Sequence, residues 1–320
     1  MFPIWQIGDL EIPMYSFMII IGIMISFVLG YFLVYKKENI SQSTLLRLLL
    51  CVVIGGVALF LGASFFDSLF HSIEEKRIGI YGITWLGGVV TGFPVAILCI
   101  HYLVPVSKGR ALYTFSLLVP LIVLAHGFGR IGCFFAGCCY GRVTDSWMGM
   151  VFPEGSLAAI QYPAADGRSL PVIPTMLIEA VFEFILFAVM MILRKKTKGH
   201  ELEMYLIVYS IFRFILEFFR GDSRGSTGIG LSPAQFLDVI CLIAGVLIIL
   251  FYKKIVFKKT YNKCLVWQEE VKNSSMLEKK EKGYRESPEA RIKELYNMKE
   301  KGIITEEEFE EKKKKLLEKI

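Results

Sequence analysis

A stretch rich in glycine, cysteine and charge follows one of the apolar runs of this sequence. It extends from His126 to Arg142 and reads HGFGRIGCFFAGCCYGR. If the apolar run before it, residues 111–125, spans a membrane, Arg130 lies at or just inside one bilayer face, where an unpaired charge is costly. Gly129 would let backbone come close to a ligand or a neighbouring helix. We therefore expect a function for Arg130, although a snorkelling arginine in a glycine-rich helix crossing would give the same pattern.

A second group of ionisable residues recurs at helical spacing. Tyr209, Arg213, Glu217 and Arg220 follow one another at intervals of four, four and three, which places them on one face of an otherwise apolar helix. This face is either an internal ladder of ion pairs or a site for an anion, because an arginine fork binds phosphate oxygens well.

Carboxylates and thiols complete the candidates for chemistry. Glu179 and Glu183 share a face of another apolar segment, so we expect them to meet arginines from neighbouring segments. The spacing Cys-x4-Cys-Cys of Cys133, Cys138 and Cys139 matches no standard zinc motif, which gives a metal site little support. Packing as small apolar residues is the favoured interpretation, while a disulfide or redox work stays open.

The elements that must position these residues are membrane helices. The chain has 320 residues, of which 54% are hydrophobic and 21% charged, a composition typical of membrane proteins. We expect an all-α polytopic bundle of about seven transmembrane helices, the first of them retained rather than cleaved as a signal peptide. The apolar windows are 13–35, 45–70, 83–104, 111–134, 172–193, 204–219 and 233–252.

Basic residues follow every second window, for example at Lys36, Lys108, Arg194 and Lys253. Such clusters mark the cytoplasmic side, which predicts an outer N-terminus and a cytoplasmic C-terminus. Both arginine groups then face the outer half of the membrane.

Local signals refine two of the windows. Gly87 and Gly88 belong to a glycine-rich start of the third window that suits either close helix contacts or a lipid chain. We expect Pro94 to bend or break that helix. Tyr15 in the first window is either an interfacial anchor or a hydroxyl aimed at a headgroup.

The last part of the chain is polar. We divide the sequence into a membrane domain, residues 1–255, a polar cytoplasmic linker, 256–287, and a two-helix segment, 288–320. Thr305 and Glu308 form a capping-box pattern at the start of the second helix. This segment resembles the short C-terminal domain, and since so small a hairpin is not stable alone, we expect self-association through it or docking.

The motifs together resemble the prolipoprotein diacylglyceryl transferase family. The resemblance covers roughly residues 13–252 and rests on segments that occur in the family's order: 129–142, 151–153, 174–179, 212–220 and 231–235. It implies a bacterial cytoplasmic membrane enzyme that transfers diacylglyceryl from phosphatidylglycerol to the lipobox cysteine of a prolipoprotein signal peptide. The resemblance implies no metal and no soluble cofactor, and we expect no nucleic-acid partner.

The resemblance also implies roles for individual residues. Arg130 and Arg213 would hold the phosphate, with Arg220 supporting them and Glu217 orienting them. Further residues expected to bind the substrate are Tyr15, Gly87, Gly88, Gly129, Glu179 and Tyr209.

The chain departs from the family pattern at three positions. Leu86 and Ile173 stand where the family has histidines, and Ser64 stands where it has an arginine. His126, four residues before Arg130, is either a replacement acid or base or a hydrogen-bonded packing histidine. The alternatives to an active enzyme are a catalytically inactive homologue that binds lipid or precursor as a scaffold, and a lipid transporter built on the same bundle.

Overall fold

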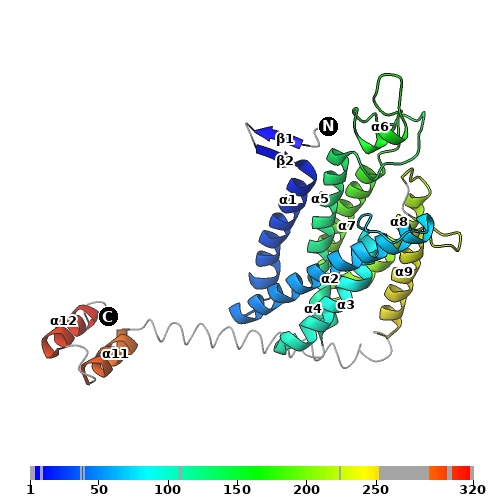
Figure 1. The fold of residues 1–320 in the computed structure, drawn as a ribbon. Helices are drawn as coiled ribbons and strands as arrows, with labels where there is room; N and C mark the ends of the chain where they lie inside the picture. The colour runs from blue at the N-terminus through cyan, green and yellow to red at the C-terminus, as the bar shows by residue number, and fades with distance from the viewer. Residues whose placement is uncertain are drawn as a thin grey trace.

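The computed structural model describes residues 4–7, 10–36, 38, 40–107, 110–222, 225–251, 288–300 and 305–317. In these residues the chain is a bundle of helices, as the sequence predicts (Figure 1). The helices of the bundle are α1 (Met14–Gly30), α2 (Gln42–Glu75), α3 (Trp85–Leu103), α4 (Ala111–Ser116), α5 (Val119–Ala136), α6 (Leu157–Gln161), α7 (Thr175–Thr197), α8 (Glu201–Glu217) and α9 (Pro233–Phe251).

Six helical segments of the described residues are long and apolar enough to cross a membrane. The sequence predicts about seven spans, and the difference is α8, which is only 17 residues long. The apolar window 111–134 is a single span by length but two helices in detail, because α4 ends at Ser116 and α5 begins at Val119. Pro120 in the first turn of α5 suits this break, since proline needs no helical hydrogen-bond acceptor there.

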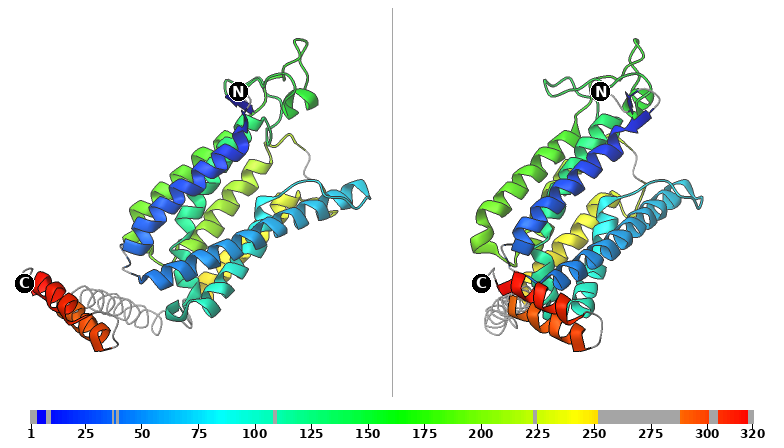
Figure 2. Two further views of the ribbon diagram at one scale, coloured as in Figure 1. Left: turned by 60° about the vertical axis from the view of Figure 1, so that its left-hand side comes forward. Right: turned by 90° about the vertical axis from the view of Figure 1, so that its left-hand side faces the viewer.

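The helices form two groups that meet around α8. Helix α5 packs between α1 and α7, whereas α2 packs along α3, and α9 contacts both α3 and α8. Figure 2 shows α1, α5 and α7 running together, with α2, α3 and α9 in the other group. Helix α8 contacts α5 and α7 as well as α9, so it joins the groups and carries side chains into the space between them.

Three local features differ from the sequence prediction. A short antiparallel hairpin, β1 (Ile4–Ile7) and β2 (Leu10–Pro13), precedes α1. A π-helix, Tyr31–Lys36, continues α1. Of the bend or break expected at Pro94, the break is wrong, because α3 continues through this residue to Leu103. Neighbouring helices make a proline tolerable within a membrane helix, and α3 has such a neighbour in α2.

Glycines let α2 and α3 approach closely. A Cβ atom on Gly92 would lie 2.6 Å from the Cβ of Leu59 and 2.8 Å from its Cα. A Cβ atom on Gly62 would lie 1.8 Å from Oγ1 of Thr91, and this hydroxyl donates a hydrogen bond to the Ala58 carbonyl at 3.1 Å. The backbones of the two helices are therefore in contact through small residues, as in other membrane helix pairs.

Replacing Gly92 by valine should separate α2 from α3. The added side chain has no space beside Leu59, and overpacking of this kind costs about 1–3 kcal/mol. Thermal unfolding of the purified protein in detergent measures the loss. Gly56→Val is the matched control, because a Cβ atom on Gly56 meets nothing within 4 Å. Equal melting temperatures for the two variants would contradict this account of the contact.

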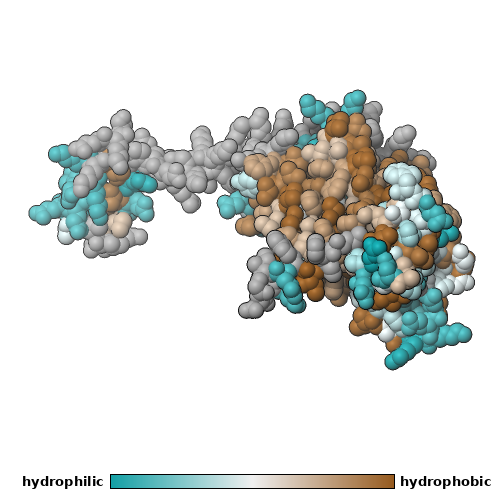
Figure 3. All heavy atoms as spheres, turned by 90° about the horizontal axis from the view of Figure 1, so that it is seen from above, coloured by the Kyte–Doolittle hydropathy of each residue, from teal (hydrophilic) through white to brown (hydrophobic). Residues whose placement is uncertain are grey.

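The outer surface of the bundle is apolar. Large side chains such as Met24, Leu61, Phe65 and Ile192 are more than half exposed. Figure 3 shows apolar residues over much of the face seen from above. In water such a surface would aggregate, so its natural surroundings are lipid chains.

The C-terminal segment contains the two helices that the sequence predicts, α11 (Pro288–Glu300) and α12 (Glu306–Leu317). The capping box is confirmed: the Thr305 amide donates to Glu308 at 3.0 Å, and the Glu308 amide donates to the Thr305 hydroxyl at 3.3 Å. Tyr296 packs edge-on against Phe309, which is buried. Residues 252–287, which include the predicted linker, lie outside the described residues.

Candidate functional site

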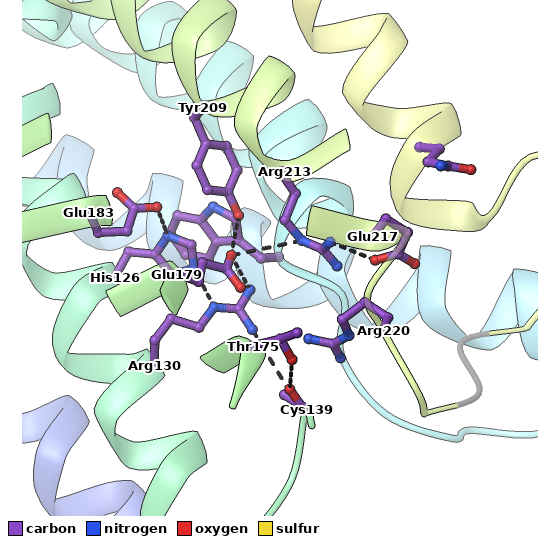
Figure 4. Close-up of polar contacts among 12 residues, drawn as sticks. His126, Arg130, Cys139, Thr175, Glu179, Glu183, Tyr209, Arg213, Glu217 and Arg220 are labelled. Carbon is purple, nitrogen blue, oxygen red and sulfur yellow. Dashed lines mark hydrogen bonds and ion pairs between the residues drawn. The ribbon is translucent and has the colours of Figure 1, made fainter. Parts of the chain in front are cut away.

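Glu179 of α7 is the centre of a buried network of charges. Its side chain is fully buried, and its Oε1 lies 3.0 Å from Nη2 of Arg130 and 3.8 Å from Nε of Arg213. The Tyr209 hydroxyl donates a hydrogen bond to the same oxygen at 2.7 Å. Figure 4 shows these side chains converging from α5, α7 and α8. The prediction that the two glutamates meet arginines from neighbouring helices is confirmed for Glu179 but wrong for Glu183, which meets His126 instead.

His126 supports Arg130 from the preceding turn of α5. The Nε–H of Arg130 donates to Nε2 of His126 at 3.2 Å, so that nitrogen carries no proton. Nδ1–H then donates to Oε1 of Glu183 at 2.7 Å. Both ring nitrogens are engaged, and the ring stacks on Trp85 with 4.0 Å between centroids. The ring is therefore hydrogen-bonded through both nitrogens, which is the arrangement that the second of the two alternatives from the sequence describes.

Arg213 has a second acidic partner on its own helix. Its Nη1 lies 2.5 Å from Oε2 of Glu217, one turn further along α8. The guanidinium is thus held between Glu179 and Glu217, with the side chain of Arg213 6% exposed. Two carboxylates in fixed positions keep this arginine oriented in a place where an isolated charge would be unstable.

Arg220 reaches the same region from outside the helix. The sequence pattern places it on the face of α8, but α8 ends at Glu217 and Arg220 pairs with Gly141 in an isolated β-bridge. Its Nη2 donates to Asp222 at 2.7 Å. Among the described residues, its buried Nε and Nη1 have no hydrogen-bond acceptor. Arg220 therefore keeps two buried donor nitrogens that no described residue accepts from.

The long segment between α5 and α7 is ordered by backbone and side-chain hydrogen bonds. The Arg142 amide donates to the Phe219 carbonyl at 2.9 Å, which ties this segment to the end of α8. The Tyr140 hydroxyl donates toward Gln161 at 2.6 Å. Burial raises the pKa of Tyr140 to about 12, so its phenol stays protonated and keeps donating. The segment thus holds Arg220 and Cys139 in place rather than forming a loose loop.

A cavity of about 1140 Å³ opens beside the charged network. Arg130, Arg213, Tyr209 and His126 line it together with Tyr15. The remainder of the wall is mainly apolar and comes largely from α1, α2 and α3: Ile19, Ile23, Leu59, Phe60, Leu86 and Phe93 among others. This volume exceeds the roughly 300–1,000 Å³ of most small-molecule sites, and its two halves suit an anionic group and apolar chains respectively.

The glycines predicted to bind substrate fall into two classes. Gly129 lines the cavity, and a Cβ atom there would meet nothing within 4 Å. Gly87 and Gly88 are buried against α2, where a Cβ atom would lie 2.6 Å from Phe66 and 2.8 Å from the Leu59 carbonyl oxygen respectively. Their place in the fold is close helix packing, the first of the two uses expected for them.

The three residues that depart from the family pattern lie in different surroundings. Leu86 is buried in the core and borders the cavity. The Ile173 backbone accepts a hydrogen bond from the Gly141 amide at 2.7 Å and donates one to Arg142 at 3.0 Å. Ser64 lies on α2, where it is partly buried.

Residue types alone did not single out several neighbours of the site. Trp85 stacks on His126 and donates to the Tyr205 hydroxyl at 2.8 Å, and the Thr175 hydroxyl donates to the Cys139 carbonyl at 2.7 Å. An indole beside a glycine pair and a hydroxyl in the first turn of a helix are ordinary in sequence. Their importance depends on contacts across the chain that spacing does not show.

Comparisons with known proteins identify the family of the chain. The sequence model of the prolipoprotein diacylglyceryl transferase family matches residues 3–251. The chain belongs to this family. The short C-terminal domain matches residues 290–317. The family match spans the whole bundle, so the network and the cavity lie within the shared part of the chain.

Curated relatives support the same assignment. A phosphatidylglycerol–prolipoprotein diacylglyceryl transferase 2 of Clostridium perfringens is 35% identical over 249 residues, which cover 76% of this chain and 92% of the relative. A transferase of Clostridium tetani with the same activity in its name is 29% identical over 255 residues, covering 77% and 95%. Another from Nitrosomonas europaea is 30% identical over 256 residues, covering 75% and 86%.

Proposed function

We propose that this protein transfers the diacylglyceryl group of phosphatidylglycerol to the cysteine thiol of a prolipoprotein, the first step of lipoprotein maturation. The observation that carries the proposal is the position of Arg130 and Arg213, which line a large, mainly apolar cavity in a multi-pass membrane protein. An anionic lipid has the same division, with phosphate at one end and acyl chains at the other. The names of the relatives identify the activity.

The arginines can stabilise the phosphate that leaves in this reaction. The sulfur of the thiol attacks the glyceryl carbon while the carbon–oxygen bond to phosphate breaks. Glycerol phosphate departs with the electron pair and takes up the proton that the thiol loses. Negative charge grows on the departing phosphate, where preorganised guanidinium groups stabilise it most. We assign this role to Arg130 and Arg213, with Arg220 adding the two donors that have no acceptor among the described residues.

Positioning residues surround these arginines. Glu179 and Tyr209 fix Arg130 and Arg213 relative to one another, and Glu217 holds Arg213 from the other side. We assign His126 to positioning of Arg130, because both of its ring nitrogens are occupied. Gly129 and Tyr15 would border the bound lipid.

The proposed location is the bacterial cytoplasmic membrane, with the site toward its outer face. The basic residues after alternate apolar windows support this orientation, since such residues stay on the cytoplasmic side. Prolipoprotein signal peptides and phosphatidylglycerol meet in that membrane, so both proposed substrates would be present.

Expression in a bacterium depleted of its own transferase tests the activity. Mass spectrometry of a lipoprotein's N-terminal cysteine should then show the diacylglyceryl mass. An unmodified cysteine despite well-inserted protein would favour the second candidate, an inactive homologue that binds lipid or precursor. Leu86 and Ile173 favour that candidate, because they place apolar side chains where the family resemblance leads us to expect histidines.

Gly129→Leu tests whether lipid occupies the cavity. The new side chain would project into the cavity, since Gly129 lines it and a Cβ atom at this position has nothing within 4 Å. We expect activity and lipid binding to fall at least about tenfold, the effect of about 1.4 kcal/mol, with little change in melting temperature. A variant with full activity would show that the lipid lies elsewhere, and a large loss of stability would show that the site is not open.

We further propose that the C-terminal helices mediate self-association. The pair α11 and α12 is too small to be stable by packing of Tyr296 on Phe309 alone, so it needs a partner surface. Light scattering of the full-length protein and of a chain ending at Ser287 compares their masses in the same detergent. Equal oligomeric states would contradict the proposal.

A further inference from the structure

Three cysteine thiols converge beside the charged network. The Sγ atoms of Cys133, Cys138 and Cys139 all lie within 4.8 Å of one another. Cys133 is buried and the other two are partly exposed. In sequence their spacing matches no standard metal motif, so the cluster is a product of the fold.

The end of α5 brings the first two thiols together. Gly137 adopts a left-handed conformation with φ of 66° and caps the helix. Its amide donates to the Phe134 carbonyl and the Cys138 amide donates to the Cys133 carbonyl, both at 3.2 Å. This pair of bonds is a Schellman motif, in which the side chains at the two ends of the longer bond come into contact. Those side chains are Cys133 and Cys138.

The third thiol reaches the cluster through a strained backbone. Cys139 has φ of 62°, a left-handed conformation that residues other than glycine seldom adopt. The Thr175 hydroxyl holds its carbonyl at 2.7 Å, so the start of α7 helps to fix this conformation. Packing of small side chains explains the Cys133–Cys138 contact of the motif, but it gives no reason for a strained residue that adds a third sulfur. Strain of this kind concentrates at functional sites.

We propose that Cys133, Cys138 and Cys139 bind a thiophilic d10 metal ion such as Zn²⁺ or Cd²⁺. Zinc–sulfur bonds of about 2.3 Å place the sulfurs of one ion roughly 4 Å apart, so the cluster needs only a small contraction. All three residues line the cavity, which leaves a fourth coordination position for water or a ligand from that side. The proposal concerns metal binding and does not rest on the proposed transferase activity.

The charge balance favours this ion. Binding converts three thiols into thiolates and releases three protons to solvent, and three thiolates with a divalent ion carry one net negative charge. Nη1 of Arg130 lies 3.9 Å from Sγ of Cys139, where its positive charge offsets that of the complex. A purely apolar thiol cluster would lack such a counter-charge.

Cadmium titration tests the site in the full-length protein. The four other cysteines, Cys51, Cys99, Cys241 and Cys264, are first replaced by alanine, and the protein is kept reduced with a phosphine in detergent. We expect one equivalent of Cd²⁺ to bind, with thiolate-to-cadmium charge-transfer absorption and proton release. Adding Cys139→Ser should weaken binding about 100-fold, at the upper end of what a lost metal-site interaction costs. Cys138→Ala should have a similar effect.

Two controls keep the test decisive. Size-exclusion profiles and helical circular dichroism must match between variants, so that loss of binding is not loss of fold. The reciprocal chain, with Cys133, Cys138 and Cys139 replaced and the other four cysteines restored, should show no charge-transfer band. Absence of the band in the three-cysteine chain, or unchanged affinity in both single variants, would overturn the proposal.

Discussion

Replacing Arg130 by lysine is expected to reduce diacylglyceryl transfer by about 100- to 1000-fold, the loss typical of removing one preorganised donor to a developing oxyanion. Lysine keeps the positive charge but lacks the fork that contacts His126 through Nε and Glu179 through Nη2 at the same time. The rate of lipidation of a signal-peptide substrate in detergent measures the effect. The loss should appear in kcat, because the arginine acts on charge that develops during the reaction.

Arg168→Lys is the matched control for this substitution. Arg168 is 60% exposed and pairs with Asp166 in the segment before α7, so its exchange should leave transfer unchanged. If Arg130→Lys retained more than half of the rate, a point charge would be sufficient, and the bidentate contact would not explain catalysis. Both variants should keep the melting temperature of the parent protein within a few degrees.

Replacing Glu179 by glutamine should destabilise the fold by about 3–5 kcal/mol, the range measured when one partner of a buried ion pair is removed. The amide can still accept from Tyr209, but it no longer balances Arg130 and Arg213. Arg213 retains Glu217, whereas Arg130 is left with a neutral histidine. Thermal or denaturant unfolding in detergent reports the loss of stability, and transfer should fall with it.

Glu183→Gln is the matched control for Glu179→Gln, because it removes an equally buried carboxylate that has no arginine partner among the described residues. Glu183 lies one turn further along α7 and is equally buried, but its partner is the Nδ1–H of neutral His126. A glutamine oxygen can accept that hydrogen bond, so we expect a loss of only about 1 kcal/mol. Similar losses in the two variants would mean that burial of a polar group, rather than the pairing of Glu179 with arginines, determines the effect.

Much of the bundle could be predicted from apolar length alone. The windows found in the sequence correspond to α1, α2, α3, α5, α7, α8 and α9, because lipid requires long apolar helices. The shortness of α8 was already visible in its apolar window, residues 204–219. The continuation of α3 through Pro94 could not be predicted, because it depends on a neighbour: Pro94 lies in a helix that packs along α2.

The site was predictable in its charges but not in its contacts. Buried arginines and glutamates in apolar helices must pair, so a partnership of Glu179 with arginines followed from the sequence. The partners of His126 did not, because periodicity cannot show that Glu183 and Trp85 reach it from other helices. The thiol cluster likewise depends on the left-handed backbone at Gly137 and Cys139, which no spacing rule reveals.

The central position of Glu179 also bears on selectivity. Its carboxylate contacts Nη2 of Arg130 and lies near Nε of Arg213, so it offsets part of their positive charge while it positions both side chains. A free phosphate ion in solution therefore gains little from these two arginines alone. A lipid headgroup has the additional binding energy of acyl chains in the apolar part of the cavity. We therefore expect the site to bind phospholipids more tightly than the soluble anions around it.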